Sequence, residues 1–543
     1  MPDAVVIGAG PNGLVAANML ADAGWDVLVV EEQAEPGGAV KSAELTEPGF
    51  VSDVFSSFFP LAVASRPLGD LHLEDHGLRW LHSAIASAHP SANGTCALLS
   101  TDLEETAASM ESFADGDGEA WRRLYSLWEQ IGDGVMETLG AGFPPLRASA
   151  KIAARLGPAE TMRLLRMSLQ GVRRLSEERF AGAGGGRILA DNALHADLAP
   201  ESPPSAIYGF VLASLGQQHG FPVPEGGAGR LTDALVARLV KAGGEVRCGE
   251  RVDGISVRAG RATGVRLTGG DEITAKRAIL ADVDAPQLYR ELLPRQAVSN
   301  RLLTDLEAFQ FDYGTVKVDW SLEAPIPWMV PDAGRAGTVH VTDDMNQLTQ
   351  QSGELAMQLI PAKPFLVMGQ YSCVDPSRMP PGKEVAWAYT HIPQRSRGDA
   401  GGRLSNDWND DDLNVFAERI EEQVERVAPG FRTMIRKRHI LGPHQFGRAD
   451  RNLVNGALNG GTAQLHQQLV FRPTPGLARP ETPIRHLYLC SAAIHPGGGV
   501  HGACGANAAR AALAWDRARR AIPIAAPAAF GLTRALRARR RKR

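Results

Sequence analysis

The order of hydrophobic and polar positions at the start of the chain predicts a strand, a helix and a second strand. Ala4–Ile7 is apolar throughout, which is typical of a strand buried on both faces of a parallel sheet. Residues 14–23 are rich in Ala and Leu and end at Gly24, as a helix with a glycine C-cap does. A second apolar run, Val27–Val30, is closed by the acid Glu31. The pattern therefore predicts a βαβ unit and a parallel sheet.

The middle of the chain carries different patterns. Apolar and aromatic residues recur at helical spacing over 121–139, which favours a core-facing helix over an aromatic substrate box. The stretches 311–322, 365–371 and 384–391 are rich in β-branched and aromatic residues and predict strands. The glycine-rich stretch 182–186 follows no apolar strand, so it predicts a flexible loop and not a second nucleotide-binding turn. The helical positions are Trp121, Leu124, Tyr125, Trp128, Ile131, Val135 and Leu139.

The first turn of the βαβ unit has the spacing Gly8-x-Gly10-x-x-Gly13. Gly8 permits the tight turn, Gly10 lets the backbone approach a pyrophosphate, and Gly13 lets the helix pack closely on the strand. The helix N-terminus would offer N–H donors to phosphates. Glu31 stands where a carboxylate accepts hydrogen bonds from ribose hydroxyls, and its charge disfavours a 2′-phosphate. The motif predicts a dinucleotide site and leaves FAD and NAD open.

A second glycine-rich turn lies near the C-terminus, between an apolar strand at 487–490 and an Ala-rich helix. Its glycines let a flat ring lie against the backbone, and the helix N-terminus can stabilise negative charge on that ring. His495 opens the turn and is the best candidate for a polar group beside the ring, the alternative being a loop histidine bonded to backbone. His501, in the same turn, is a weaker candidate. The glycines are Gly497, Gly498, Gly499, Gly502 and Gly505.

The glycine pattern continues with Gly37-Gly38, and as a whole it resembles the flavoprotein superfamily of glutathione reductase, amine oxidases and carotenoid desaturases. The segments 465–473, 482–484 and 495–499 are most similar to the phytoene-desaturase-like group, in the branch of pyridine nucleotide-disulfide oxidoreductase domain-containing protein 2. The resemblance implies FAD as the cofactor, with His495 as the catalytic candidate. It implies cofactor contacts from Gly8, Gly10, Pro11, Asn12, Gly13, Glu31, Glu32, Gly37, Gly38, Ala39, Lys41, Val252, Gly497, Gly498, Gly499, Val500 and Gly502.

The same resemblance implies an FAD-dependent oxidoreductase, in particular a desaturase or dehydrogenase that moves hydride from an apolar, isoprenoid- or lipid-like substrate to flavin N5. Two departures count against phytoene itself: Ala39 replaces the arginine that normally follows the glycine pair, and residues 53–56 replace an Asp-x-Gly-Pro segment. Without a second nucleotide fingerprint, O2 or a quinone is the expected oxidant of the flavin. A flavoprotein amine oxidase and a non-catalytic binding protein of the same fold are the alternatives.

These segments together predict an α/β protein. A Rossmann-like FAD-binding domain, of the glutathione-reductase and amine-oxidase type, is expected to be interleaved with an α+β substrate domain. The FAD-binding domain is predicted to take residues 1–70, 222–290 and 475–520. The substrate domain is predicted to take residues 71–221 and 291–474, and a basic tail residues 521–543.

Composition changes this picture little. The 543 residues are 44% hydrophobic and 22% charged, as in folded globular proteins, and a formal net charge of −4 gives no sign of nucleic-acid binding. The 5 cysteines are scattered, which argues against a disulfide scaffold, a redox pair or a cysteine-based metal site and fits a reducing cytoplasm. The sequence suggests neither a signal peptide nor a membrane span. A cytoplasmic location is therefore expected.

Basic residues gather in two segments. Residues 147–179 combine cations with apolar side chains at helical spacing, and a solvated helix face is favoured over a helix lying on an anionic membrane. Residues 531–543 carry cations and no acid. A disordered tail is favoured there, and weak adhesion to anionic lipid is the second interpretation. The expected partner is an apolar small-molecule substrate, and peripheral membrane association through this tail is the alternative to a purely cytoplasmic protein.

Overall fold

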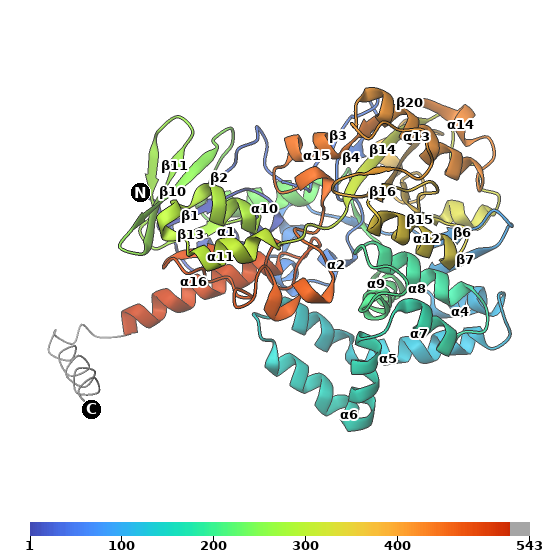
Figure 1. The fold of residues 1–543 in the computed structure, drawn as a ribbon, viewed down its shortest axis with the longest axis horizontal. Helices are drawn as coiled ribbons and strands as arrows, with labels where there is room; N and C mark the ends of the chain where they lie inside the picture. The colour runs from blue at the N-terminus through green and yellow to red at the C-terminus, as the bar shows by residue number, and fades with distance from the viewer. Residues whose placement is uncertain (522–543) are drawn as a thin grey trace.

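The computed structural model describes residues 1–521, so the predicted basic tail beyond Ala521 lies outside the described part. A five-stranded parallel sheet forms one half of the molecule (Figure 1), with β1 at its centre and buried along its whole length. The predicted βαβ unit is β1, α1 and β2. In spatial order the strands are β21 (Leu487–Leu489), β13 (Ala278–Ala281), β1 (Ala4–Ile7), β2 (Val27–Val30) and β9 (Glu245–Arg247).

Layers cover both faces of this sheet. One face packs against α1 (Pro11–Asp22), α10 (Gly229–Lys241) and α16 (Ala503–Ala521). Helices α1 and α16 meet so closely that a Cβ on Gly505 would lie 1.9 Å from the carbonyl oxygen of Asn12. The other face is covered by α11 (Asn300–Glu307) and a three-stranded antiparallel sheet. That sheet consists of β10 (Val252–Arg258), β11 (Arg261–Leu267) and β12 (Glu272–Thr274).

A seven-stranded mixed sheet forms the second half of the molecule. The three strands predicted at 311–322, 365–371 and 384–391 are present as β14, β17 and β18. The outer face of the sheet packs against α13 (Asp410–Glu425) and α14 (Phe431–Met434). In spatial order the strands are β20 (Ile435–Leu441), β14 (Gly314–Leu322), β18 (Glu384–Ile392), β17 (Leu366–Gln370), β15 (Ala336–Val341), β6 (Ile85–Pro90) and β7 (Cys96–Ser100).

Helices cover the inner face of the seven-stranded sheet (Figure 1). The predicted long helix is α5, and its Trp121, Trp128 and Ile131 are buried in the core. The loop predicted at 182–186 is wrong, because residues from Gly184 onward form the first turn of the buried helix α8. The helices are α4 (Leu103–Glu111), α5 (Asp117–Gly140), α6 (Leu146–Ser168), α7 (Val172–Arg179), α8 (Gly184–Leu194) and α9 (Ser205–His219).

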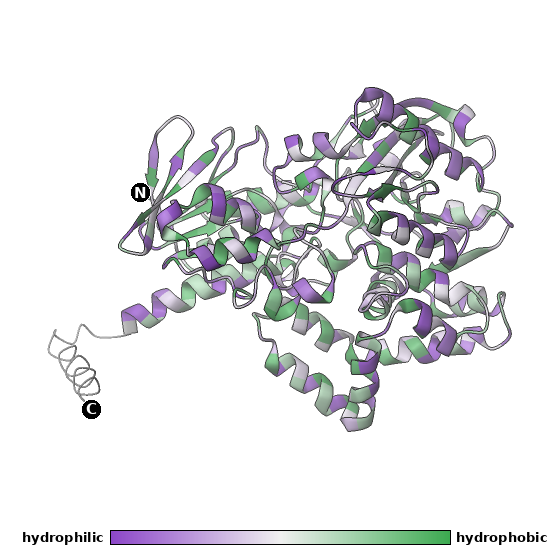
Figure 2. Ribbon diagram, viewed as in Figure 1, coloured by the Kyte–Doolittle hydropathy of each residue, from purple (hydrophilic) through white to green (hydrophobic). Residues whose placement is uncertain are grey.

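Short elements complete the described chain. Helix α16 changes from hydrophobic where it packs on the sheet to hydrophilic at its far end (Figure 2), which matches a helix leaving the body of the protein. The remaining helices are α2 (Pro60–Val63), α3 (Arg66–Gly69), α12 (Met345–Ala356) and α15 (Pro443–Ala449). The remaining strands are β3 (Ser42–Ala43), β4 (Ser52–Asp53), β5 (Trp80–Leu81), β8 (Val223–Pro224), β16 (Leu359–Ile360) and β19 (Gly398–Asp399).

The α/β class predicted from the sequence is confirmed by this architecture. Strands of the parallel sheet come from the segments 1–70, 222–290 and 475–520, and strands of the seven-stranded sheet come from 71–221 and 291–474. One pair crosses the predicted boundary, since β5 pairs with β8. The boundaries themselves stay predictions. Within residues 1–521, none of the helices combines the length and hydropathy that crossing a bilayer requires.

Candidate functional site

One cavity of about 790 Å³ extends from the first turn of the βαβ unit to the inner face of the seven-stranded sheet. Both halves of the molecule line it: α1 and the loop 495–502 from one half, and α5, α9 and the sheet from the other. Its volume lies in the range of small-molecule and cofactor sites. The cavity is therefore the candidate site for a cofactor and a substrate.

The three fingerprint glycines lie where any side chain would collide. Gly8 has φ +93°, and a Cβ there would lie 2.9 Å from the carbonyl oxygen of Asp282. A Cβ on Gly10 would lie 2.8 Å from Oδ2 of Asp282, and one on Gly13 would lie 2.3 Å from the carbonyl oxygen of Gly8. Gly13 thus provides the close approach of helix and strand expected from the motif. Gly8 and Gly10 pack closely on Asp282, and both border the cavity with bare backbone.

Asp282 is a site residue that no sequence motif reveals. It follows β13, lines the cavity, and accepts a hydrogen bond from the backbone N–H of Gly13 at 2.8 Å. Burial raises the pKa of this carboxyl to about 8, and the nearby Asp450 and Glu31 contribute to the rise. Asp282 is thus predominantly protonated at neutral pH. A neutral acid at the N-terminus of α1 leaves the positive end of the helix dipole available to phosphate groups.

Glu31 lies at the end of β2, as predicted, and lines the cavity. Its Oε2 accepts from the N–H of Ala9 at 2.7 Å, and its Oε1 accepts from the N–H of Gln33 at 2.9 Å. These bonds hold the carboxylate beside the glycine turn. Glu32 and Val252 line the same end of the cavity.

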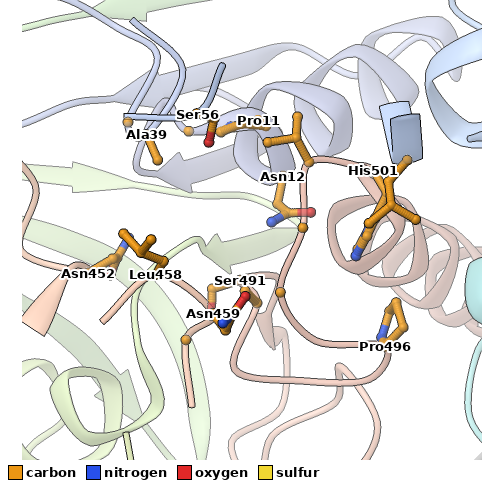
Figure 3. A pocket seen from close by; sticks show the side chains of 18 of the residues that line it. Pro11, Asn12, Ala39, Ser56, Asn452, Leu458, Asn459, Ser491, Pro496 and His501 are labelled. Carbon is orange, nitrogen blue, oxygen red and sulfur yellow. The ribbon is translucent and has the colours of Figure 1, made fainter. Parts of the chain in front are cut away.

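The C-terminal glycine turn is held by a buried cation, Arg472, which lies in the segment 465–473 and to which the sequence assigns no role. Arg472 as a whole is 1% exposed, and its guanidinium donates to the carbonyl oxygens of Ala492 at 2.8 Å and Asn459 at 2.7 Å. Since each carbonyl belongs to a segment at the cavity wall, Arg472 ties these segments together. Figure 3 shows the result: side chains from α1, such as Asn12, and from the C-terminal turn, such as His501, surround one space.

His495 lies at the cavity wall and is 5% exposed. Its Nε2 has no hydrogen-bond partner within the described residues, and its ring packs edge-on against Phe143 at 5.6 Å. His501 also lines the cavity with an Nε2 that is unpartnered in residues 1–521, while its Nδ1 accepts from the N–H of Ala503 at 3.0 Å. Burial lowers the pKa of His495, and lowers that of His501 to about 4. Both rings are therefore neutral and can bond a ligand.

The opposite end of the cavity has Lys317 in its wall, on β14. Its ammonium group donates to Asp319 at 2.5 Å and to the carbonyl oxygen of Asp53 at 2.9 Å. The same group lies 5.7 Å from the ring of Trp387, which stacks on Tyr389. The sequence assigns Lys317 no role, because a lysine in a strand pattern does not reveal which face it occupies.

The predicted cofactor residues fall into two groups. Residues that line the cavity are Gly8, Gly10, Pro11, Asn12, Glu31, Glu32, Gly38, Ala39, Val252, Gly498, Gly499 and Val500. Residues that are not part of the cavity lining are Gly13, Gly37, Lys41, Gly497 and Gly502. Gly502, for example, packs against Val15: a Cβ added to Gly502 would lie 2.7 Å from Cγ2 of Val15. The individual cofactor contacts and the catalytic role of His495 stay predictions.

These features suit a dinucleotide carrying a flat redox ring. Bare glycine backbone and a helix N-terminus suit the pyrophosphate. Asn12 Oδ1 and His501 Nε2, which lack partners among the described residues, suit a polar ring system at the other glycine turn. The fold and the site define an FAD-dependent oxidoreductase. The chain belongs to the flavin containing amine oxidoreductase family, whose model matches residues 12–318.

Full-length relatives agree with this assignment. The chain is 28% identical over 547 residues to "Pyridine nucleotide-disulfide oxidoreductase domain-containing protein 2" of Mus musculus, covering 93% of this chain and 92% of the relative. It is 24% identical over 521 residues to "Phytoene desaturase (lycopene-forming)" of Pseudescherichia vulneris, covering 94% and 99%. The predicted group and the FAD cofactor are thereby confirmed.

Solved structures share the fold at low identity. An oxidoreductase from Methanosarcina mazei superposes with a TM-score of 0.60 at 16% identity, covering 94% of this chain and 99% of the other. Putrescine oxidase bound to putrescine superposes with a TM-score of 0.56 at 16% identity, covering 95% and 99%. These likenesses describe the fold alone.

Proposed function

We propose that this protein is a dehydrogenase that removes a hydride from one carbon of an apolar substrate and releases a proton from the adjacent carbon to solvent, and so introduces a double bond. The observation that carries the proposal is the apolar part of the cavity wall. FAD, when bound, supplies the hydride acceptor. The apolar part consists of Phe58, Leu61, Val135, Met136, Leu139, Ile207, Val211, Leu212, Leu215, Leu465 and Leu469.

Each part of the chain has a distinct task in this proposal. The glycine turn before α1 would hold the pyrophosphate, with Asp282 protonated beside it. The turn 495–502 would hold the ring, fixed from behind by Arg472. The apolar wall would orient the substrate's hydrocarbon part and exclude water, which prevents side reactions of a reduced flavin.

Relatives named as desaturases support the proposal. "All-trans-zeta-carotene desaturase" of Myxococcus xanthus is 25% identical over 91% of this chain, and a "Phytoene desaturase (neurosporene-forming)" of Rhodobacter capsulatus is 25% identical over 97%. An apolar hydrocarbon skeleton is the feature that the substrates in these names have in common. For this chain we propose the same substrate class, with O2 or a quinone reoxidising the flavin.

Anaerobic reduction of the bound flavin tests the proposal. The purified protein is mixed without oxygen with isoprenoids, other lipids and amines, and the visible absorbance of the oxidised flavin is followed. Bleaching by isoprenoids or lipids, reversed by O2 or a quinone, is the expected result. Bleaching by amines alone would establish an amine oxidase instead, and a protein that carries no flavin after purification would refute the proposal.

A further inference from the structure

The inner face of the seven-stranded sheet, which forms one wall of the cavity, is unexpectedly polar. Strand register aligns His340, Val367, Tyr389 and Lys317 across four neighbouring strands. Because side chains alternate along a strand, these residues and those two positions away share one face. The alternate residues of the same strands, such as Val316 and Val339, belong to the apolar core on the other face. The cavity therefore faces polar groups on β15, β18 and β14, such as Thr338, Tyr389 and Lys317.

Several polar atoms on this wall are buried and have no partner within residues 1–521. They are Oδ1 of Asn192, Oγ1 of Thr338 and Oγ1 of Thr315, in residues that are 1%, 2% and 1% exposed and that all line the cavity. Asn192 uses its amide N–H to bond the carbonyl oxygen of Ile188 at 2.8 Å, so its oxygen remains as an acceptor. An unpartnered buried group costs about 1–3 kcal/mol. Such groups point to a ligand that hydrogen-bonds.

A pair of histidines adds to this polar wall. His195 follows α8, one turn after Asn192, and its Nε2 lies 2.7 Å from Nε2 of His340 on β15. One hydrogen lies between the two nitrogens, so the pair can exchange donor and acceptor roles by changing tautomer. His195 lines the cavity and His340 shares a sheet face with Thr338. Asn192, His195 and Thr338 thus form one polar patch.

The carboxylates around the patch already have hydrogen-bond partners, and the buried Arg187 donates to the carbonyl oxygens of Pro90 and Thr342. Asp191 bonds His89 at 2.6 Å, and Lys317 bonds Asp319 at 2.5 Å. Asp197 lies 3.0 Å from His391. Burial lowers the pKa of His195 to about 3, so its ring is neutral. An ammonium or carboxylate group would meet no unpaired opposite charge among the residues that line this part of the cavity and would lose its hydration. A hydroxyl can both donate to Asn192 Oδ1 and accept from Thr338 or His195.

We infer that the polar patch of Asn192, His195 and Thr338 binds an uncharged hydroxyl group, and that the substrate is an alcohol with an apolar body. The inference deepens the proposed function and rests on it only in treating the cavity as the substrate site. A pure hydrocarbon would displace water from the patch and leave its atoms unpaired, whereas a hydroxyl replaces the water. Sites built in this way reject analogues that lack the bonding group.

Binding to the purified flavoprotein tests the inference without requiring turnover. Geraniol, farnesol and geranylgeraniol are titrated calorimetrically beside their hydrocarbon counterparts and the corresponding amines. We expect at least one alcohol to bind at least tenfold more tightly than both its hydrocarbon and its amine. Thr338→Val, which keeps the side-chain shape, and Asn192→Leu are each expected to reduce that preference about three- to tenfold, the value of one hydrogen bond.

Thr390→Val is the matched control. Thr390 is also 1% exposed with an Oγ1 that lacks a partner in the described chain, but it lies opposite Val316 on the other face of the sheet. The control should leave the alcohol preference unchanged, and the flavin content of each variant shows whether it has folded. The inference is overturned if no alcohol is preferred, or if Thr338→Val and Asn192→Leu change the preference no more than Thr390→Val does. Flavin that no compound reduces, beside an intact alcohol preference, would refute the dehydrogenase but not the hydroxyl site.

Discussion

The raised pKa of Asp282 makes stability depend on pH in a way that one substitution should remove. In the unfolded chain an aspartate titrates near its ordinary value of 3.8, whereas burial raises the folded value to about 8. Between these values the folded state binds one proton more than the unfolded state, so stability falls as pH rises through this window. Below pH 4 and above pH 8 this carboxyl no longer makes the free energy of unfolding depend on pH.

The size of the effect follows from the same interval. At 1.36 kcal/mol per pH unit, an interval from 3.8 to about 8 gives a ceiling of about 6 kcal/mol. Because Asp282 lines a cavity and its ionised form would still accept the N–H of Gly13, we expect about half of this, about 3 kcal/mol. For a chain of this length that corresponds to about 3 °C in melting temperature.

Asp282→Asn is the perturbation. An asparagine keeps the acceptor for Gly13 and cannot ionise, so the variant should gain stability relative to wild type at pH 8 and little at pH 5. Thermal unfolding of both proteins at these two pH values measures the difference, with Asp271→Asn at an exposed position as the control. A difference between Asp282→Asn and wild type that is equal at pH 5 and pH 8 would refute the reasoning, because it would show that the carboxyl does not change protonation in this range.

Further predictions concern packing, the buried cation and the tail. Gly505→Ala should destabilise the protein by about 3 kcal/mol and lower its flavin content, because the new Cβ would lie 1.9 Å from the Asn12 carbonyl oxygen; Gly353→Ala, in open space on α12, should not. Arg472→Met should lower the melting temperature and the flavin content by leaving buried carbonyls unpaired, whereas Arg432→Met at the surface should do neither; equal effects would contradict this role. Removal of residues 522–543 should abolish cosedimentation with phosphatidylserine vesicles at low salt without changing flavin content; undiminished sedimentation would exclude the tail as the anchor.

Local sequence was sufficient for the nucleotide-binding turns. The strand–turn–helix pattern around Gly8 and Gly10 involves neighbours in the chain, so spacing alone predicts it. The helix beginning at Gly184 shows the opposite case. Glycine disfavours helices, but here a Cβ on Gly184 would lie 2.6 Å from the Phe113 ring, and one on Gly185 would lie 2.7 Å from the Phe180 ring. Tertiary packing therefore selects glycine at this helix start and overrides its low propensity.

The remaining site residues depend on contacts between distant segments. Asp282 reaches Gly13 across 269 positions, and Arg472 reaches Asn459 and Ala492 only because two loops meet at the cavity. Lys317 lies in a strand that the sequence pattern predicts, and His340 lies in one that it does not. The face that they share is set by the register of the strands between them, β18 and β17. A shift of one residue in the strand register would move each of these side chains to the other face of the sheet. Spacing rules cannot provide that information.

The two ends of the cavity are therefore specified by different means, and this has a consequence for the reaction. The cofactor end is formed largely by backbone, since bare Gly8 and Gly10 adjoin the N-terminus of α1. The far wall carries side chains, with Asn192 and Thr338 offering directional bonds. An apolar wall between them holds a substrate without fixing its depth. A hydroxyl anchored at the far wall would fix that depth, and would thereby determine which C–H bond faces the flavin. Substitutions in the polar patch should then alter the position of the new double bond as well as affinity.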